Sequence, residues 1–183
     1  KGRNEENSIL DSFLENINAN GGTPSDQFFD LYPFDGDLAY QTFLINPTTA
    51  DSNIYSSVIP NGGISQSMSI ESSGYMGEFS LGMAGKVDDY VFVGLSLGFP
   101  NIDYEENKSY SETDDDGTVF VNDTSLTYRD FRALRYDNYL RTTGNGFNMK
   151  AGVLVMPVDW LRLGLAVHSP TWFFMSDIYS SRM

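Results

Sequence analysis

The chain of 183 residues has only one histidine and no cysteine, and the absence of cysteine excludes several classes of chemistry. Without cysteine there is no disulfide, no thiol nucleophile and no thiolate ligand for a metal. Basic residues are also scarce, with 11 Lys and Arg against 25 Asp and Glu, which gives a formal net charge of −14. This balance argues against a basic patch that binds nucleic acid or an anionic membrane surface.

The chain also lacks any apolar run of the ~20 residues that a membrane-spanning helix needs. A membrane crossing would therefore require strands, whose backbone groups are satisfied by neighbouring strands. Lys1 is not followed by the apolar core of a signal peptide, and the chain ends directly after a predicted strand. We therefore expect an internal piece of a larger protein.

Two parts of the chain alternate strongly between apolar and small or polar residues. Residues 144–171 predict a hairpin of two strands of ~10 residues around a tight turn at residues 157–159. Residues 77–99 repeat this design around a turn at residues 87–89. Because successive side chains on a strand point to opposite faces, each hairpin has one apolar face. The apolar positions are odd-numbered: Phe79, Leu81, Met83, Val91, Val93, Leu95, Leu97, Phe99, Phe147, Met149, Ala151, Val153, Val155, Leu161, Leu163, Leu165 and Val167.

The two faces favour a membrane barrel over a soluble sandwich. A sandwich has a solvated outer face that is rarely rich in glycine, whereas here the second face mixes glycine, serine and alanine with scattered charges. Strands of ~9–11 residues match a tilted transmembrane strand. We predict an all-β fold, a transmembrane antiparallel β-barrel with lipid on the apolar face and the lumen on the other. Four strands are fewer than the ~8 of the smallest barrel, so we expect a segment of one.

The predicted strands divide the chain into five segments. Residues 64–107 and 138–175 form the two barrel hairpins. Residues 1–63 form an extracellular loop region with two short helices, residues 108–137 an acidic extracellular loop, and residues 176–183 the start of the next such loop.

Aromatic residues flank both ends of the predicted strands, where membrane barrels carry interfacial girdles. One group lies beside the short turns and a second lies toward the long connections. The first group is Tyr90 and Trp160, and the second is Phe99, Tyr104, Trp172, Phe173 and Phe174.

Several stretches resemble one family of membrane barrels. Residues 144–152, Trp160 to Gly164 and His168 to Thr171 are similar to the late-middle barrel of the FadL-like outer-membrane transporters of long-chain fatty acids and aromatic hydrocarbons. Ser73-Gly74 and residues 90–94 also fit this family. The resemblance implies a fourteen-stranded barrel with an N-terminal hatch, a ligand-capture groove among loop helices, and lateral exit through the wall. The hatch signature and the later strands are absent from this sequence.

A predicted amphipathic helix over residues 8–19 suggests where an apolar ligand is first captured. Its apolar side chains, with others from the following segment, are candidates for the wall of a concave groove. The alternative is that they pack the loop onto itself. The candidates are Ile9, Leu10, Phe13, Leu14, Ile17, Leu38, Phe43 and Leu44.

The predicted lumen face carries four ionisable residues, Glu78, Lys150, Arg162 and His168. Lys150 and Arg162 are placed to pair with the carboxylate of a fatty acid through charge-assisted hydrogen bonds. The alternative is that they pair with Glu78 or with acidic residues of a hatch, because charges inside a barrel need partners. We favour this structural alternative.

No enzyme activity, cofactor or metal site is expected. His168 directly precedes Ser169, so the two side chains point to opposite faces and cannot form a catalytic pair on a strand. The acidic run at residues 114–117 lacks the alternating ligands of a calcium-binding loop.

We expect the parent protein to reside in the outer membrane of a Gram-negative bacterium, in contact with lipid or detergent, and to take up hydrophobic small molecules passively. Two alternatives stay open. One is a non-transporting subunit of a protein-secretion or surface-attachment machine, which would bind other envelope proteins. The other is a soluble β-rich binding domain, for instance for glycans. Nucleic acid is not an expected partner.

Overall fold

The computed structural model describes residues 2–4, 8–50, 52–59, 64–114 and 131–183. Over these residues the protein consists mostly of antiparallel strands with a few short helices, which confirms the predicted β-rich antiparallel fold. The chain divides into two compact units. We call residues 72–106 and 140–178 the hairpin unit, and residues 1–71, 107–139 and 179–183 the helical unit.

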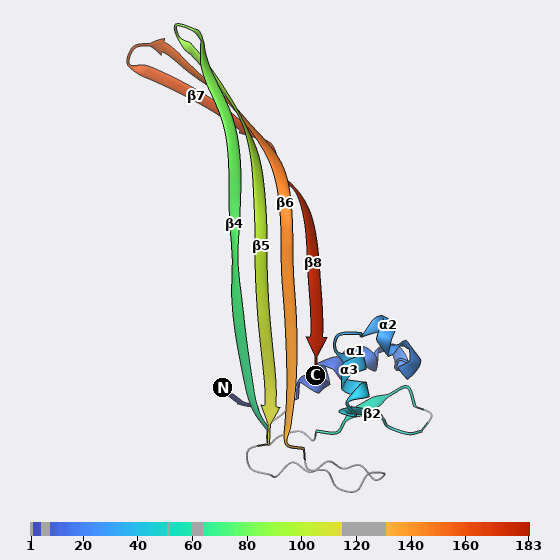
Figure 1. The fold of residues 1–183 in the computed structure, drawn as a ribbon. Coiled ribbons are helices and arrows are strands. Elements are labelled where there is room, and N and C mark those ends of the chain that lie inside the picture. The colour runs from blue at the N-terminus through green and yellow to red at the C-terminus, as the bar shows by residue number, and fades with distance from the viewer. Residues whose placement is uncertain (1, 5–7, 51, 60–63, 115–130) are drawn as a thin grey trace. The chain divides into compact units, whose positions relative to one another are not determined.

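The main sheet is built from long neighbouring strands in chain order (Figure 1). They are β4 (Ile64–Asp88), β5 (Val91–Thr113), β6 (Ala133–Val158), β7 (Leu161–His168) and β8 (Trp172–Arg182). Both β7 and β8 pair with β6, so they act as one strand with an interruption. The short β1 (Gly2–Asn4) pairs with the beginning of β4.

These strands are far longer than the alternating pattern predicts. β4, β5 and β6 have 25, 23 and 26 residues, and the predicted strand bounds are therefore wrong. Residues 108–113 and 133–137, predicted to lie in an acidic loop, belong to β5 and β6. Residues 176–182, predicted to start another loop, belong to β8. Hydrophobic alternation marks only the part of a strand that has an apolar face, and the backbone pairing continues beyond it.

The predicted tight turns are present. β4 and β5 are separated by Asp89 and Tyr90, and β6 and β7 by Asp159 and Trp160. The register of the second hairpin places Val155 opposite Leu163, and it shifts before Val158 meets Leu161. Such a shift near a turn increases the local twist without moving the apolar side chains of the paired segment to the other face.

The helical unit contains α1 (Ile9–Ile17), α2 (Phe28–Leu31), α3 (Gly36–Gln41) and the strand pair β2 (Ile45–Pro47) and β3 (Tyr55–Ser57). The first predicted helix is present, and Ser8 caps it in a reciprocal capping box with Asp11. The sequence also predicts a second helix over residues 37–45, which is only partly correct: α3 ends at Gln41, and Phe43 adopts a left-handed conformation with φ of 60°.

The core of the helical unit is formed by the apolar face of α1 and residues from the strands. Phe28 has its ring within 5.3 Å of the Tyr40 ring and 4.9 Å of the Tyr55 ring. Phe13 packs edge-on against Tyr136, at 5.5 Å between ring centroids. The other buried apolar residues are Leu10, Leu14, Ile17, Ala39, Ile45, Ile59, Ile64, Phe131 and Leu134.

A buried carboxylate fastens α1 to the end of β5. Glu112 is fully buried, and it accepts hydrogen bonds from the Ser8 hydroxyl at 2.6 Å and the Ile9 backbone N–H at 2.7 Å. The Tyr110 hydroxyl donates a third hydrogen bond at 2.7 Å and the Gln66 amide a fourth at 3.1 Å. Burial, the hydrogen bond to Glu112 and the charge of that carboxylate raise the pKa of Tyr110. A negative charge at the first turn also complements the helix dipole.

Replacement of Glu112 by Gln should loosen α1. Hydrogen bonds to a charged group contribute about 1.5–3 kcal/mol, so we expect hydrogen exchange of the α1 amides to accelerate roughly tenfold to a hundredfold. Glu15→Gln, at an exposed position on the same helix, is the matched control and should leave exchange nearly unchanged. Equal protection of α1 in both variants would contradict the proposed anchor.

Candidate functional site

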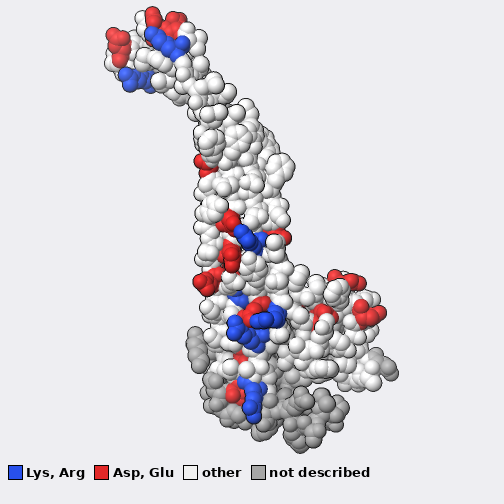
Figure 2. Space-filling view, viewed as in Figure 1, with Lys and Arg blue, Asp and Glu red and all other residues white. Residues whose placement is uncertain are grey.

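The apolar face of the hairpin unit is exposed. Phe79, Leu81 and Leu165 have 69%, 61% and 74% of their surface accessible. Figure 2 shows charged side chains gathered at the hairpin turns and an uncharged stretch of surface next to them. An apolar surface of this extent on a protein marks contact with another protein or with lipid. The other large apolar residues on this face with substantial exposure are Met83, Val87, Val93, Leu95, Phe99, Met149, Val153, Leu163 and Val167.

The apolar stretch has the same length on neighbouring strands. It runs over residues 79–87 on β4, 91–99 on β5 and 147–155 on β6. Eight steps at ~3.3 Å give about 26 Å along each strand. The predicted strand length thus corresponds to the apolar stretch, although each strand continues well beyond it.

A row of aromatic rings crosses four strands at one end of the apolar stretch. Phe79 lies 6.4 Å from Phe99, Phe99 lies 5.7 Å from Phe147, and Phe147 stacks on Trp172 at 6.3 Å between ring centroids. We call these four residues the aromatic row. At the opposite end of the stretch, Tyr90 and Trp160 are exposed at the turns, with Trp160 83% accessible.

The grouping of aromatic residues differs from the prediction. Phe99 and Trp172 belong to the aromatic row, and Phe174 is exposed. Phe173, however, packs on the opposite side, because a Cβ added to Gly146 would lie 3.0 Å from its ring. Tyr104 also differs from the aromatic row, because it is an even-numbered residue of β5, and its hydroxyl donates to Glu106 at 2.9 Å.

An interruption between β7 and β8 causes this change of face. The Ser169 hydroxyl accepts from the Met149 backbone N–H at 2.9 Å, while the Ser169 N–H donates to the Met149 carbonyl at 2.9 Å. A side-chain oxygen thereby replaces a backbone carbonyl in the ladder. Beyond this point even-numbered residues such as Trp172 share the face of odd-numbered residues such as Phe147.

The opposite face of the hairpin unit carries a polar bridge across three strands. Lys150 on β6 donates to Glu78 on β4 at 2.8 Å, and the Asn148 amide donates to the same carboxylate at 3.2 Å. The intervening strand β5 has Gly98 at this place. A Cβ on Gly98 would lie 2.6 Å from both the Glu78 and the Asn148 side-chain oxygens. Only glycine therefore leaves room for the bridge.

The four ionisable residues predicted on this face are partly brought together. Lys150 pairs with Glu78, as the favoured structural alternative predicts. His168 lies directly opposite Lys150 in the β6–β7 register. Arg162 is six residues earlier on β7, roughly 20 Å away along the strand, and is exposed near the turn.

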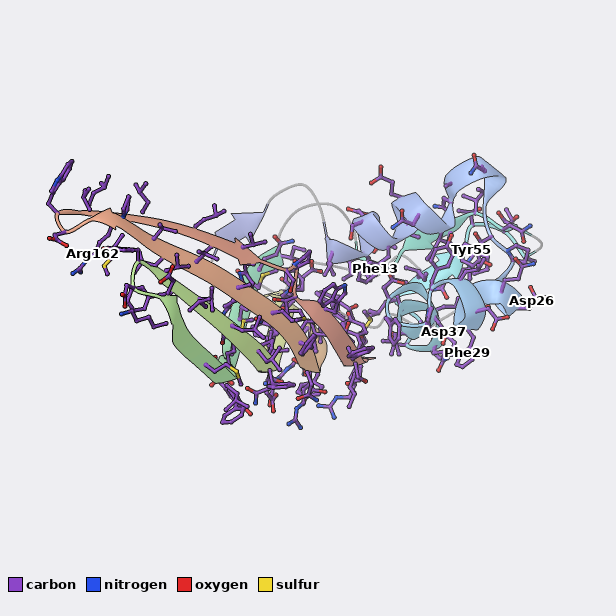
Figure 3. The ribbon with its side chains drawn as sticks, turned by 90° about the horizontal axis from the view of Figure 1, so that it is seen from above. Phe13, Asp26, Phe29, Asp37, Tyr55 and Arg162 are labelled. Carbon is purple, nitrogen blue, oxygen red and sulfur yellow. The ribbon has the colours of Figure 1, made fainter. Side chains whose placement is uncertain are left out.

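The residues predicted to line a capture groove are mostly core residues. Leu10 and Ile17 are buried almost completely, and Phe13 and Leu14 retain no more than a tenth of their surface. The groove prediction is wrong for these four, because an amphipathic helix lowers its free energy by burying its apolar face. Ile9, Leu38 and Leu44 are partly buried against the same core, and Phe43 is exposed. Figure 3 shows Phe13 on α1 and Phe29 outside the core.

Other chemistry is limited in the part of the chain that the structure describes. There, no group of three or more His, Asp or Glu side chains is arranged to hold a metal ion. Of the acidic run at residues 114–117, only Asp114 falls within the described residues. No helix in the described ranges is long and apolar enough to cross a membrane.

Comparisons with known proteins give no match, neither among protein-family models nor among curated proteins. The resemblance to the FadL-like transporters therefore stays a prediction that depends on the residues themselves.

The sequence pattern assigned Phe79 and Phe147 to the apolar face but not to the aromatic groups, and it did not single out Asn148. Phe79 and Phe147 complete the aromatic row, and their odd-numbered positions opposite Phe99 were a usable signal. Asn148 is almost fully buried in the polar bridge. Its role depends on pairing between strands that are 70 residues apart in sequence, which a local pattern does not reveal.

Substitution of Gly98 by Ala should break the polar bridge. The added Cβ would force the Glu78 and Asn148 side chains apart, and overpacking of this kind costs about 1–3 kcal/mol. A urea titration of the folded protein in detergent measures this loss. Gly85→Ala is the matched control, because nothing lies within 4 Å of a Cβ placed there. Equal midpoints for the two variants would refute the role assigned to Gly98.

Proposed function

We propose that this chain forms part of the wall of a transmembrane antiparallel barrel in the outer membrane of a Gram-negative bacterium. The observation that carries the proposal is the exposed apolar face of the hairpin unit, which aromatic residues border at both ends. Membrane barrels have an apolar band ~25 Å tall between two aromatic girdles. The nine residues of the stretch are at the lower end of the ~9–11 that a tilted strand needs to cross such a band. At a tilt of ~35–45° the stretch of about 26 Å rises roughly 20 Å, and the aromatic residues at its two ends lie at the borders of the band.

The other face supports the same orientation. It carries glycine, serine and alanine together with the bridge between Glu78 and Lys150, which suits a lumen lined by small and polar groups. On this face each charge of the Glu78–Lys150 pair has an opposite charge beside it, whereas an unpaired charge that faced lipid would be energetically costly. We therefore assign the odd-numbered residues of β4, β5, β6 and β7 to lipid and the even-numbered residues to the lumen.

The edges of the sheet call for more strands. Over the described residues, β4 beyond Gln66 pairs only with β5, and β7 and β8 pair only with β6. Unpaired backbone groups are not tolerated in the hydrocarbon core, so a membrane location requires closure of the sheet. We propose that further strands complete the wall, with fourteen as the number that the FadL-like resemblance suggests.

For the complete barrel we propose passive uptake of hydrophobic molecules, such as long-chain fatty acids or aromatic hydrocarbons. Only the small side chains of Ala84 and Ala166 lie near a Cβ placed at Gly94 and Gly152, which leaves lumen space for a ligand. No covalent step or cofactor is required. The core position of α1 removes that helix from the proposal as a capture groove.

The membrane assignment predicts opposite effects at two neighbouring residues. Val167→Arg puts a charge on the apolar face, at a site that is 65% accessible, and should oppose insertion by about 2–4 kcal/mol near the midplane. His168→Arg puts the same charge on the other face, where repulsion by Lys150 directly opposite should cost no more than about 1 kcal/mol. Folding into vesicles, followed by urea titration, measures both. Equal effects of the two changes would contradict the facing assignment.

Ligand binding separates transport from the alternatives. A transporter should show saturable binding of a long-chain fatty acid when the full-length protein is titrated in detergent, whereas a secretion or attachment subunit should show none. A soluble binding domain, in which the aromatic row would stack on sugar rings, should stay monodisperse without detergent. Monodisperse behaviour in plain buffer would overturn the membrane proposal.

A further inference from the structure

The helical unit contains a polar cavity that the proposed transport does not use. The cavity has a volume of about 520 Å³, and its walls are formed by residues of β4, β5, β6 and β8. Volumes of this size are typical of small-molecule sites. Its lining consists of serine, asparagine, tyrosine and charged side chains from these strands.

The charges around this cavity are unusual for this chain. Only 11 of the 183 residues are Lys or Arg, yet Lys108, Arg135 and Arg182 all line the cavity. Glu71 and Asp137 are the acidic residues there. Three basic residues against two acidic ones give the cavity lining a formal charge of +1, on a chain whose formal net charge is −14, so an anion meets less repulsion here than over the chain as a whole.

Asp137 holds the two arginines at this place. Its carboxylate accepts from Arg135 Nε at 2.9 Å and lies 3.9 Å from Arg182 Nη2. Hydrogen bonds from Ser109 and Arg135 lower the pKa of Asp137, so the carboxylate stays ionised and keeps both guanidinium groups nearby. The arginine side chains remain 69% and 85% exposed, which leaves them accessible to a ligand.

The remaining lining groups suit a sugar. Ser109 and Ser181 offer hydroxyl groups, and Asn138 offers an amide whose oxygen accepts from Ser181 at 2.8 Å. Hydroxyl and amide groups exchange hydrogen bonds with sugar hydroxyls, while a guanidinium forms bidentate hydrogen bonds with phosphate.

From this arrangement we infer that the cavity binds a phosphorylated sugar, with Arg135 and Arg182 on the phosphate and the hydroxyl and amide side chains on the sugar ring. The same chemistry occurs in a phosphorylated glycolipid head group and in a free sugar phosphate. The glycolipid source rests on the proposed function, because it requires this part of the sheet to stand beside the head groups of a membrane.

The test uses the full-length protein in detergent and three probes. They are lipid A, which carries a phosphorylated glucosamine disaccharide, the soluble glucosamine 1-phosphate, and glucosamine without phosphate. Binding is measured by the shifts of ¹⁵N-labelled arginine side-chain resonances. The double variant R135Q/R182Q is compared with R132Q/R162Q, which removes the same charge at exposed arginines outside the cavity.

We expect both phosphorylated probes, or lipid A alone, to bind at least roughly tenfold more weakly to R135Q/R182Q than to R132Q/R162Q, and glucosamine not to bind. Binding of lipid A alone identifies the head group as the ligand, and binding of glucosamine 1-phosphate identifies a sugar phosphate. No binding of either phosphorylated probe, or equal affinity of the two variants, overturns the inference. The insertion comparison between Val167→Arg and His168→Arg is independent of this cavity, so a failure here leaves the membrane proposal standing.

Discussion

The hairpin unit is governed by the separation of its side chains onto two faces. Each strand places large apolar residues on one side, where those of β4 and β7 such as Leu81 and Leu165 stay exposed. In water such a surface costs about 25 cal/mol for each Å² of apolar area, so the fold is complete only when something covers it. Lipid would satisfy this need, and the position of the aromatic row at the end of the apolar stretch then has a physical explanation.

The second face allows the strands to meet without a conventional core. Gly98 leaves room for Glu78 and Lys150 to join across β5, so that strands which are not neighbours are tied together by polar contacts. In the helical unit a different carboxylate has a related role, because Glu112 gathers donors from α1, β4 and β5. In both units a carboxylate connects segments that lie far apart in the sequence.

The sequence predicts the hairpins and turns of this fold better than the contacts between strands that are far apart in the sequence. The period of two correctly indicates the hairpins and their turns, because it follows directly from strand geometry. It misses the polar halves of the strands, where both faces tolerate hydrophilic residues, and the change of face at Ser169. The sequence also left undecided what covers the apolar face of α1, because an apolar stripe on a helix does not show whether a protein core or a ligand will cover it. Contacts such as Asn148 with Glu78 depend on register between distant strands.

The central claim is that odd-numbered residues of the apolar stretch touch lipid. These 183 residues contain no cysteine, so spin labels on single introduced cysteines can be placed at each position from Phe147 to Val155 of the full-length protein in vesicles, after replacement of any cysteine outside this chain. Collisions with oxygen, which concentrates in lipid, and with a water-soluble nickel complex then report the surroundings of each label. Our account predicts that oxygen accessibility peaks at odd positions and nickel accessibility at even positions. Equal nickel accessibility at both sets, or the reversed pattern, would contradict it.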